Sequence, residues 1–297
     1  MPDASMSLVK EFGKVCVRAH DFAVDFVQDF GPEPLPNSIA DREMGDLSNT
    51  GTDGRPWSRQ VVGSAYSIAN AIFIVAAGQY LRSLGILLCQ DDAALFGFQA
   101  VTRSLVEAAA RAWWILQSDI SARERVIRGR IERFDSIVER DKFLRAGDPN
   151  LATVSDSQIS FRAKTAALGI EETQDQNGNF LRFERVIRPN NITAVTTFLA
   201  DRGEPDPEKW YRYYSGIAHS AIFASTSNLE AVLDEATGYY RYEPRLPLAD
   251  YFDAVRVAQG SFLAVVARNA MLFGHDHEPL FRESERLDQV LISLSMD

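Results

Sequence analysis

The amino-acid sequence predicts an all-α protein, an antiparallel helical bundle with additional helices and two irregular loops. Apolar residues recur at spacings of three and four along almost the whole chain, and strict alternation of apolar and polar residues is nearly absent. The composition, with 46% hydrophobic and 24% charged residues over 297 positions, is that of an ordinary globular protein with ample material for a core. The length allows two domains and equally permits one elongated helical domain, and we expect a single helical domain over residues 1–297.

The first half of the chain reads as an N-terminal helix, a polar loop and the start of the bundle. The loop, residues 31–57, carries Gly and Pro and is long for a connection inside a domain, so it is either packed and irregular or partly mobile. The core bundle is expected over residues 58–295. The helices expected in this half are Leu8–Phe30, Arg59–Cys89, Asp91–Gln117 and the charged helix Ala122–Ala146, which GDPN at Gly147–Asn150 ends.

The second half begins with a short helix, Ser157–Leu168, and a polar segment over residues 170–190. That segment is expected to form a loop or a small hairpin turning at Asn177-Gly178. Helices resume near Asn191. Asp206-Pro207-Glu208 has the residues of a helix start, with Asp as the N-cap and Pro at the first helical position. The last two helices are expected over Leu248–Phe273 and Pro279–Leu294.

Charge and cysteine content narrow the class of protein. The chain has 41 acidic and 31 basic residues, a formal net charge of -10, which argues against a general electrostatic nucleic-acid binder but leaves room for a local basic groove. Cys16 and Cys89 lie in apolar helical surroundings, as expected of reduced, buried thiols in a cytoplasmic protein. The N-terminal residues include Asp3 and Glu11 and have no apolar core, so they do not resemble a secretory signal.

One window, Val61–Leu81, is uncharged for 21 residues and is long enough to span a bilayer of roughly 30 Å. It contains Ser64, Ser67, Asn70 and Gln79, and the helical pattern continues beyond it. These features favour a buried core helix and no contact with a membrane. A membrane span remains the alternative.

The segment WYRYYSGIAHS, residues 210–220, carries the clearest chemical pattern. Arg212 and His219 are seven residues apart, which on a helix returns to within about 20° of the same direction. Ser215 and Gly216 fall on either side of the line between them and leave space for an anion. A histidine transfers protons near neutral pH, and an arginine is a permanent cation matched to phosphoryl oxygens. Together they have the chemistry needed to cleave a phosphodiester.

The run Arg212-Tyr-Tyr-Ser-Gly-Ile-Ala-His219 resembles the Arg, four to six residues, His signature of the HEPN superfamily, over about ten residues. That superfamily contains all-helical, metal-independent ribonucleases of toxin–antitoxin and phage-defence systems. The chain is also similar to a group of bacterial helical proteins that pair an Arg/Glu-bearing helix with a later Tyr/Ser/Gly/His segment. The resemblance implies that Arg212 and His219 are the catalytic pair, that two motifs face each other in a homodimer, and that cleavage leaves a cyclic phosphate.

A second pattern lies in the helix FGFQAVTRSLVEAAARAWWIL, where Arg103, Glu107 and Arg111 occur at four-residue steps. Such a ladder stabilises a surface helix by itself. If the helix is buried, the charges need partners or a cleft, and Glu107 would then orient Arg212 or His219 while Arg103 contacts substrate. We therefore include these three residues with Ser215, Gly216 and Tyr211 as candidates to line the site, and a salt-bridged structural stripe is the alternative.

Other motifs are weaker. The charged helix Ala122–Ala146 has a local excess of arginine and lysine and reads as a solvated face with interleaved ion pairs or as an RNA-facing stripe. His275-Asp276-His277-Glu278 offers metal-capable groups without a second ligand cluster. No phosphate-binding loop, GxSxG or HExxH occurs in the sequence. We therefore predict no metal and no cofactor.

Taken with the resemblance, these observations predict a metal-independent endoribonuclease, a defence or toxin effector with RNA as substrate and an antitoxin-like protein as a further partner. The competing prediction is a non-catalytic helical binding or scaffolding protein. In it, the same residues fix helix packing or receive a partner protein or a small anionic ligand.

Overall fold

The computed structural model describes residues 4–30, 33–90, 97–148, 155–174, 176, 180–218, 229–233, 239–244 and 247–296. Over these residues the protein is all-α apart from two small hairpins, which confirms the predicted fold class. The helices are α1 (Ala4–Gln28), α2 (Ile39–Gly45), α3 (Arg59–Ser67), the π-helix η1 (Ile68–Ile74), α4 (Val75–Leu88), α5 (Gly97–Ile115), α6 (Ala122–Gly147), α7 (Asp156–Ala167), α8 (Asn191–Asp201), α9 (Pro207–Ala218), α11 (Leu248–Phe273) and α12 (Glu278–Met296). The strands are β1 (Glu172–Gln174), β2 (Phe180–Phe183), β3 (Leu229–Leu233) and β4 (Tyr240–Pro244).

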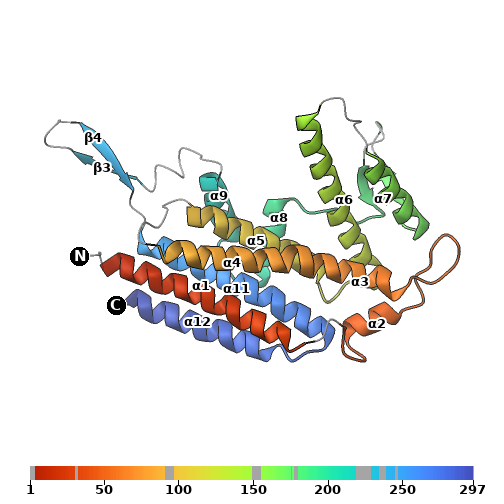
Figure 1. Ribbon diagram of the computed structural model, residues 1–297, viewed down its shortest axis with the longest axis horizontal. Helices are drawn as coiled ribbons and strands as arrows, with labels where there is room; N and C mark the ends of the chain where they lie inside the picture. The colour runs from red at the N-terminus through yellow and green to blue at the C-terminus, as the bar shows by residue number, and fades with distance from the viewer. Residues whose placement is uncertain are drawn as a thin grey trace.

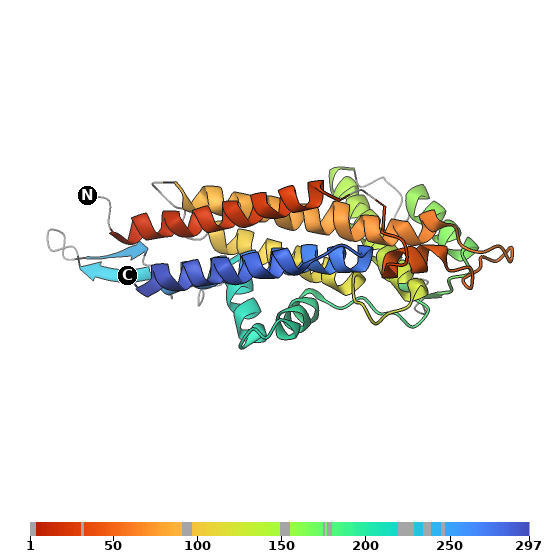
Figure 2. The same cartoon turned by 90° about the horizontal axis from the view of Figure 1, so that it is seen from below.

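Long helices lying side by side make an elongated bundle (Figures 1 and 2). α1, α4, α5 and α11 pack around one apolar core, and α12 covers α1 and α11. Consecutive long helices such as α1, α4 and α5 alternate in direction, while α11 begins at the same end of the bundle as α1 (Figure 1). The two ends of the chain therefore lie at one end of the molecule, and α6, α7 and α2 lie towards the other.

The apolar window predicted from the sequence lies in one continuous helix, Arg59–Leu88, formed by α3, η1 and α4. Among the described residues it is the one helix that is long and apolar enough to cross a membrane. Core helices of soluble proteins can have the same length and composition. It packs against α1, α5 and α6. A third of its most apolar window is buried, and Ile72, Val75 and Ile86 are exposed.

α1 and α4 approach closely because two glycines face each other. A Cβ added to Gly85 would lie 2.7 Å from a methyl carbon of Val17 and 2.8 Å from the carbonyl oxygen of Gly13. Cys89 follows at the end of α4, and both cysteines are free, Cys16 buried and Cys89 half-buried. Burial raises the pKa of the Cys16 thiol, so this side chain stays protonated at neutral pH.

The segment 31–57 is not wholly irregular, because it contains the short helix α2. Ser38 caps its N-terminus by accepting a hydrogen bond from the backbone N–H of Asp41 at 3.1 Å. Glu43 in α2 accepts two hydrogen bonds from Arg125 of α6, at 2.8 and 3.0 Å, and one from the Tyr66 hydroxyl at 2.7 Å. This buried ion pair attaches the segment to the bundle.

The sequence predicts that the charged helix α6 is either a solvated face or an RNA-facing stripe. In the first half of α6 the structure shows neither. The Arg125 side chain is fully buried and also donates to the carbonyl oxygens of Ile115 and Gln117, at 2.6 and 3.0 Å. Arg128 is buried too and donates to the carbonyl oxygen of Trp114 and to the Gln117 side chain. These arginines satisfy the carbonyl groups that the end of α5 leaves without helical partners, so here they are neither a solvated face nor an RNA-facing stripe.

Of the two alternatives predicted for residues 170–190, a loop or a small hairpin, the structure has the hairpin, formed by β1 and β2, which pair antiparallel with a bulge between Thr173 and Gln174. Its expected turn at Asn177-Gly178 lies outside the described residues. β3 and β4 form a second antiparallel hairpin, which the sequence reading missed, and it extends beyond the end of the bundle (Figure 1). α9 begins at Pro207, as predicted.

Candidate functional site

The helix that carries the Arg212 motif, α9, packs on α5 through a cluster of three side chains. The Tyr211 hydroxyl donates to a carboxylate oxygen of Glu107 at 2.8 Å, and Arg103 donates to the same oxygen at 2.9 Å. The Arg103 guanidinium also lies over the Tyr211 ring, 5.6 Å from its centroid. The structure thus brings together three residues that the sequence analysis selected as site-lining, Arg103 and Glu107 from α5 and Tyr211 from α9.

Local sequence explains why these side chains meet. Arg103 and Glu107 are four residues apart, which is the spacing of an ion pair on one helix face. On α9, Tyr211 and Tyr214 are buried and separated by three residues, so this face packs inward. Trp210 stacks on Tyr214 with ring centroids 4.2 Å apart. The aromatic face fixes α9 on the bundle, and the Tyr211 hydroxyl sets its position along α5.

Two effects raise the pKa of Tyr211: burial is the larger, and the hydrogen bond to Glu107 is the next. Burial lowers the pKa of Arg103, but the Glu107 carboxylate and the Tyr211 hydroxyl more than offset this and leave that pKa raised. At neutral pH the phenol is therefore protonated and the guanidinium charged. The cluster is a donor–acceptor unit that positions α9, and the Tyr211 phenol does not serve as a base.

Arg212 lies on the outer flank of α9. Its guanidinium pairs with Glu208 one turn earlier, at 2.8 Å, and the two side chains are 66% and 63% exposed. It lines an open hollow between α8 and α9, together with Lys209 and Tyr213. His219, the other half of the predicted catalytic pair, lies outside the described residues, and α9 ends at Ala218.

The other predicted site residues occupy two different surroundings. Ser215 and Gly216 are half-buried on α9, with Ser215 one turn beyond Tyr211 on the same side of the helix. Arg111 is one turn beyond Glu107 on α5, but its guanidinium is buried between Glu132, the Pro189 carbonyl and the Asn191 side chain. Arg111 therefore ties α5 to α6 and to the start of α8.

One pair of side chains next to α9 was missed from the sequence. The Tyr213 hydroxyl donates to Asp250 at the start of α11 across 3.4 Å. Burial, together with the nearby negative charge of Asp253, raises the pKa of Asp250. The two residues of the pair are far apart in sequence, so no local spacing could indicate it. It adds a carboxyl group of raised pKa beside the helix that carries Arg212.

Removing the Tyr211 hydroxyl tests how much the cluster contributes to the docking of α9. Tyr211→Phe is expected to lower the free energy of unfolding by about 1–2 kcal/mol, because a buried hydrogen bond to a carboxylate is lost while the ring remains. Urea unfolding followed by circular dichroism measures the change. Tyr80→Phe, at a tyrosine on α4 that is 39% exposed, is the matched control and should change stability by less than about 0.5 kcal/mol. Equal stability of the two variants would contradict the assigned role.

Among the described residues, no group of three or more His, Cys, Asp or Glu side chains is arranged to hold a metal ion. No model of a known protein family matches this chain, and no match was found among curated proteins or solved structures. The fold and site define an all-α bundle in which an Arg–Glu–Tyr cluster docks a helix bearing an exposed arginine.

Proposed function

We propose that this protein is a metal-independent endoribonuclease of the HEPN type, which cleaves RNA at the outer flank of α9. The observation that carries the proposal is the exposed guanidinium of Arg212 beside an open hollow. Its partner Glu208 is equally exposed, and a surface ion pair of this kind is worth about 0–1 kcal/mol. A phosphate group is therefore able to displace Glu208 at little cost.

In the proposed reaction, the 2′-oxygen of a ribose attacks the adjacent phosphorus and the bond to the 5′-oxygen breaks, which leaves a 2′,3′-cyclic phosphate. His219 takes the proton from the 2′-hydroxyl, and a proton is returned to the departing 5′-oxygen. Arg212 stabilises the negative charge that grows on the phosphoryl oxygens. Atoms and charge balance without a metal or an external reactant.

The Arg103–Glu107–Tyr211 cluster supports this chemistry indirectly, by fixing the helix that carries Arg212. It touches no substrate in the proposed arrangement, so its members are positioning residues. By fixing α9 on α5, the cluster holds Arg212 at a defined place on the helix flank, and preorganised donors accelerate reactions more than mobile ones do. Ser215 and Gly216, with small side chains on the same helix, leave space beside the reacting phosphate.

The resemblance also supplies the proposed setting of the enzyme. We infer a cytoplasmic homodimer in which two α9 flanks face one RNA, acting as a toxin or defence effector and held inactive by an antitoxin-like protein.

The test is RNA cleavage by the purified protein in excess EDTA, with the ends of the products identified by mass spectrometry. We expect cyclic-phosphate ends from the wild type and a loss of rate of about a hundredfold or more in both Arg212→Ala and His219→Ala. Arg55→Ala, at a side chain 87% exposed in the loop before α3, is the matched control and should cut at the wild-type rate.

Circular dichroism of all four proteins shows whether each variant keeps its helices. If the wild type and both site variants leave a mixed RNA pool equally intact while folded, the nuclease proposal is wrong. If the variants cut at the wild-type rate, the assignment of Arg212 and His219 is wrong. In the first of these two outcomes, in which no RNA is cut, the remaining interpretation would be a non-catalytic binding or scaffolding protein.

A further inference from the structure

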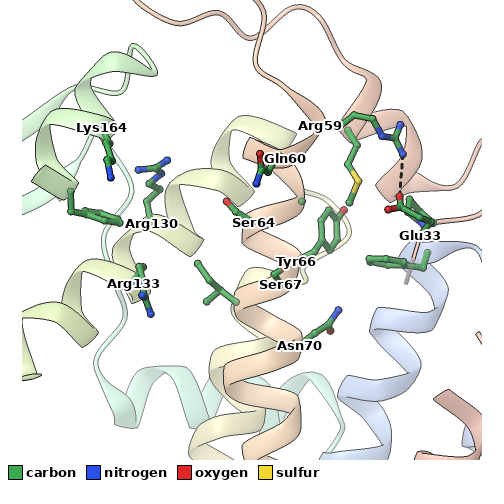
Figure 3. Close-up of a pocket in the computed structure, with 16 residues that line it drawn as sticks. Glu33, Arg59, Gln60, Ser64, Tyr66, Ser67, Asn70, Arg130, Arg133 and Lys164 are labelled. Atoms are coloured by element: carbon green, nitrogen blue, oxygen red, sulfur yellow. Dashed lines mark ion pairs between the residues drawn. The ribbon is translucent and has the colours of Figure 1, made fainter. Parts of the chain in front are cut away.

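α3, α6 and α7 lie at the end of the molecule away from the chain termini (Figure 1). A large cavity opens there between α3 and η1 on one side and α6 and α7 on the other (Figure 3). Its volume is about 870 Å³, within the range of small-molecule binding pockets. The two walls come together at Gly129, where an added Cβ would lie 3.0 Å from Ala65. This close crossing of α3 and α6 fixes the helices beside which the cavity opens.

Three cationic side chains stand together on one wall (Figure 3). Arg130 and Arg133 are one turn apart on α6, and Lys164 comes from α7. Within the described part of the chain, none of the three forms an ion pair with a carboxylate. The acidic residue that lines the cavity, Glu33, pairs with Arg59 at 3.8 Å on the far side. The wall therefore carries an uncompensated positive charge.

Arg130 is held in place by neutral groups. Its guanidinium donates to the buried Thr165 hydroxyl at 3.0 Å and lies 5.2 Å from the centroid of the Phe161 ring. Burial lowers the pKa of Arg130, yet an arginine remains charged at neutral pH. A partly buried cation without a counterion is costly, and an anion placed in the cavity would offset that cost.

The opposite wall offers hydrogen-bonding groups. Gln60 and Ser64 on α3 line the cavity opposite the three cations (Figure 3). Further along, Asn70 in the π-helix η1 has a buried side-chain oxygen with no hydrogen-bond partner among the described residues. π-Helical turns inside α-helices are frequent at functional sites. This oxygen can accept a hydrogen bond from an N–H or O–H group of a bound molecule.

We propose that this cavity binds a small phosphate-bearing molecule, with its phosphate group between Arg130, Arg133 and Lys164. The size of the cavity, the charge of the wall and the fixed position of Arg130 together favour a compact polyanion. The proposal is independent of RNA cleavage, because the cavity shares no residue with the α9 site.

Isothermal titration calorimetry at constant ionic strength tests the proposal, with inorganic pyrophosphate and adenosine 5′-monophosphate as the probes. We expect the wild type to bind at least one of them, and Arg130→Gln and Lys164→Gln each to weaken that binding by about tenfold or more. Lys142→Gln, at an exposed lysine of α6 that pairs with Glu139, is the matched control and should bind as the wild type does. Lys164 is exposed, so its substitution should leave the fold intact.

Arg212→Ala separates this site from the proposed nuclease site, because it removes any binding of the probes at α9 while the binding that Arg130→Gln and Lys164→Gln weaken should remain in it. The proposal would be overturned if the wild type bound neither probe. It would also be overturned if Lys164→Gln and Lys142→Gln bound the probes equally well. Neither result bears on the cleavage of RNA at α9.

Discussion

Replacing Glu43 by alanine is expected to lower the free energy of unfolding by about 3–5 kcal/mol, because it leaves the fully buried Arg125 without its carboxylate partner. Arg125 would keep its bonds to two backbone carbonyls, and Tyr66 would lose the acceptor for its hydroxyl. The segment 33–58 should separate from the bundle before global unfolding. Urea unfolding measures the loss of stability, and hydrogen exchange shows where protection falls first.

Two further variants make this expectation specific. Glu33→Ala removes an exposed carboxylate that pairs weakly with Arg59, and should change stability by less than about 0.5 kcal/mol. The double substitution Glu43→Ala/Arg125→Met removes both charges and should recover part of the loss, since apolar replacements of buried ion pairs are often tolerated. A loss below about 1 kcal/mol in Glu43→Ala would show that the pair does not hold the segment.

Gly85→Val is expected to lower the free energy of unfolding by about 3 kcal/mol, at the upper end of the usual cost of overpacking a core. The new Cβ would lie 2.7 Å from a Val17 methyl carbon and 2.8 Å from the Gly13 carbonyl oxygen. The backbone oxygen retreats only if α1 moves away from α4. Better helix propensity of valine over glycine offsets this by only a few tenths of a kcal/mol.

Gly147→Val is the matched control, since a Cβ at Gly147 meets nothing within 4 Å. It is expected to change stability by less than about 0.5 kcal/mol. Thermal and urea unfolding of both variants compare the two sites. If Gly85→Val were as stable as Gly147→Val, the close approach of α1 and α4 would not be a constraint on the fold.

Much of the helical framework could be predicted, because a long helix has an apolar periodicity that can be recognised in the sequence. The prediction Arg59–Cys89 differs from the helix Arg59–Leu88 by one residue, and Leu248–Phe273 coincides with α11. Short elements were missed where the period is too brief to detect. α2 was missed in this way, although its N-cap Ser38, with Asp41 three residues later, is a sequence signal of a helix start that could have indicated it.

The candidate site could be predicted only in part. The four-residue step from Arg103 to Glu107 indicates a pair, but the contact with Tyr211 spans 104 residues and depends on how α9 docks. The burial of Arg125 could not be foreseen for a similar reason. Its helix has a weak apolar pattern, and its partners are carbonyls at the end of α5 and the Glu43 carboxylate of α2. Such tertiary partners leave no trace in local spacing.

α1 packs against α4, which follows it early in the sequence, and also against α11 and α12, which are far from it in the sequence. Contacts between residues distant in sequence form slowly and prolong the exposure of apolar surface during folding. The part of the α1 face that α11 and α12 cover is therefore expected to stay open longer than the part that α4 covers, and it is the part most exposed to misassociation while the protein folds.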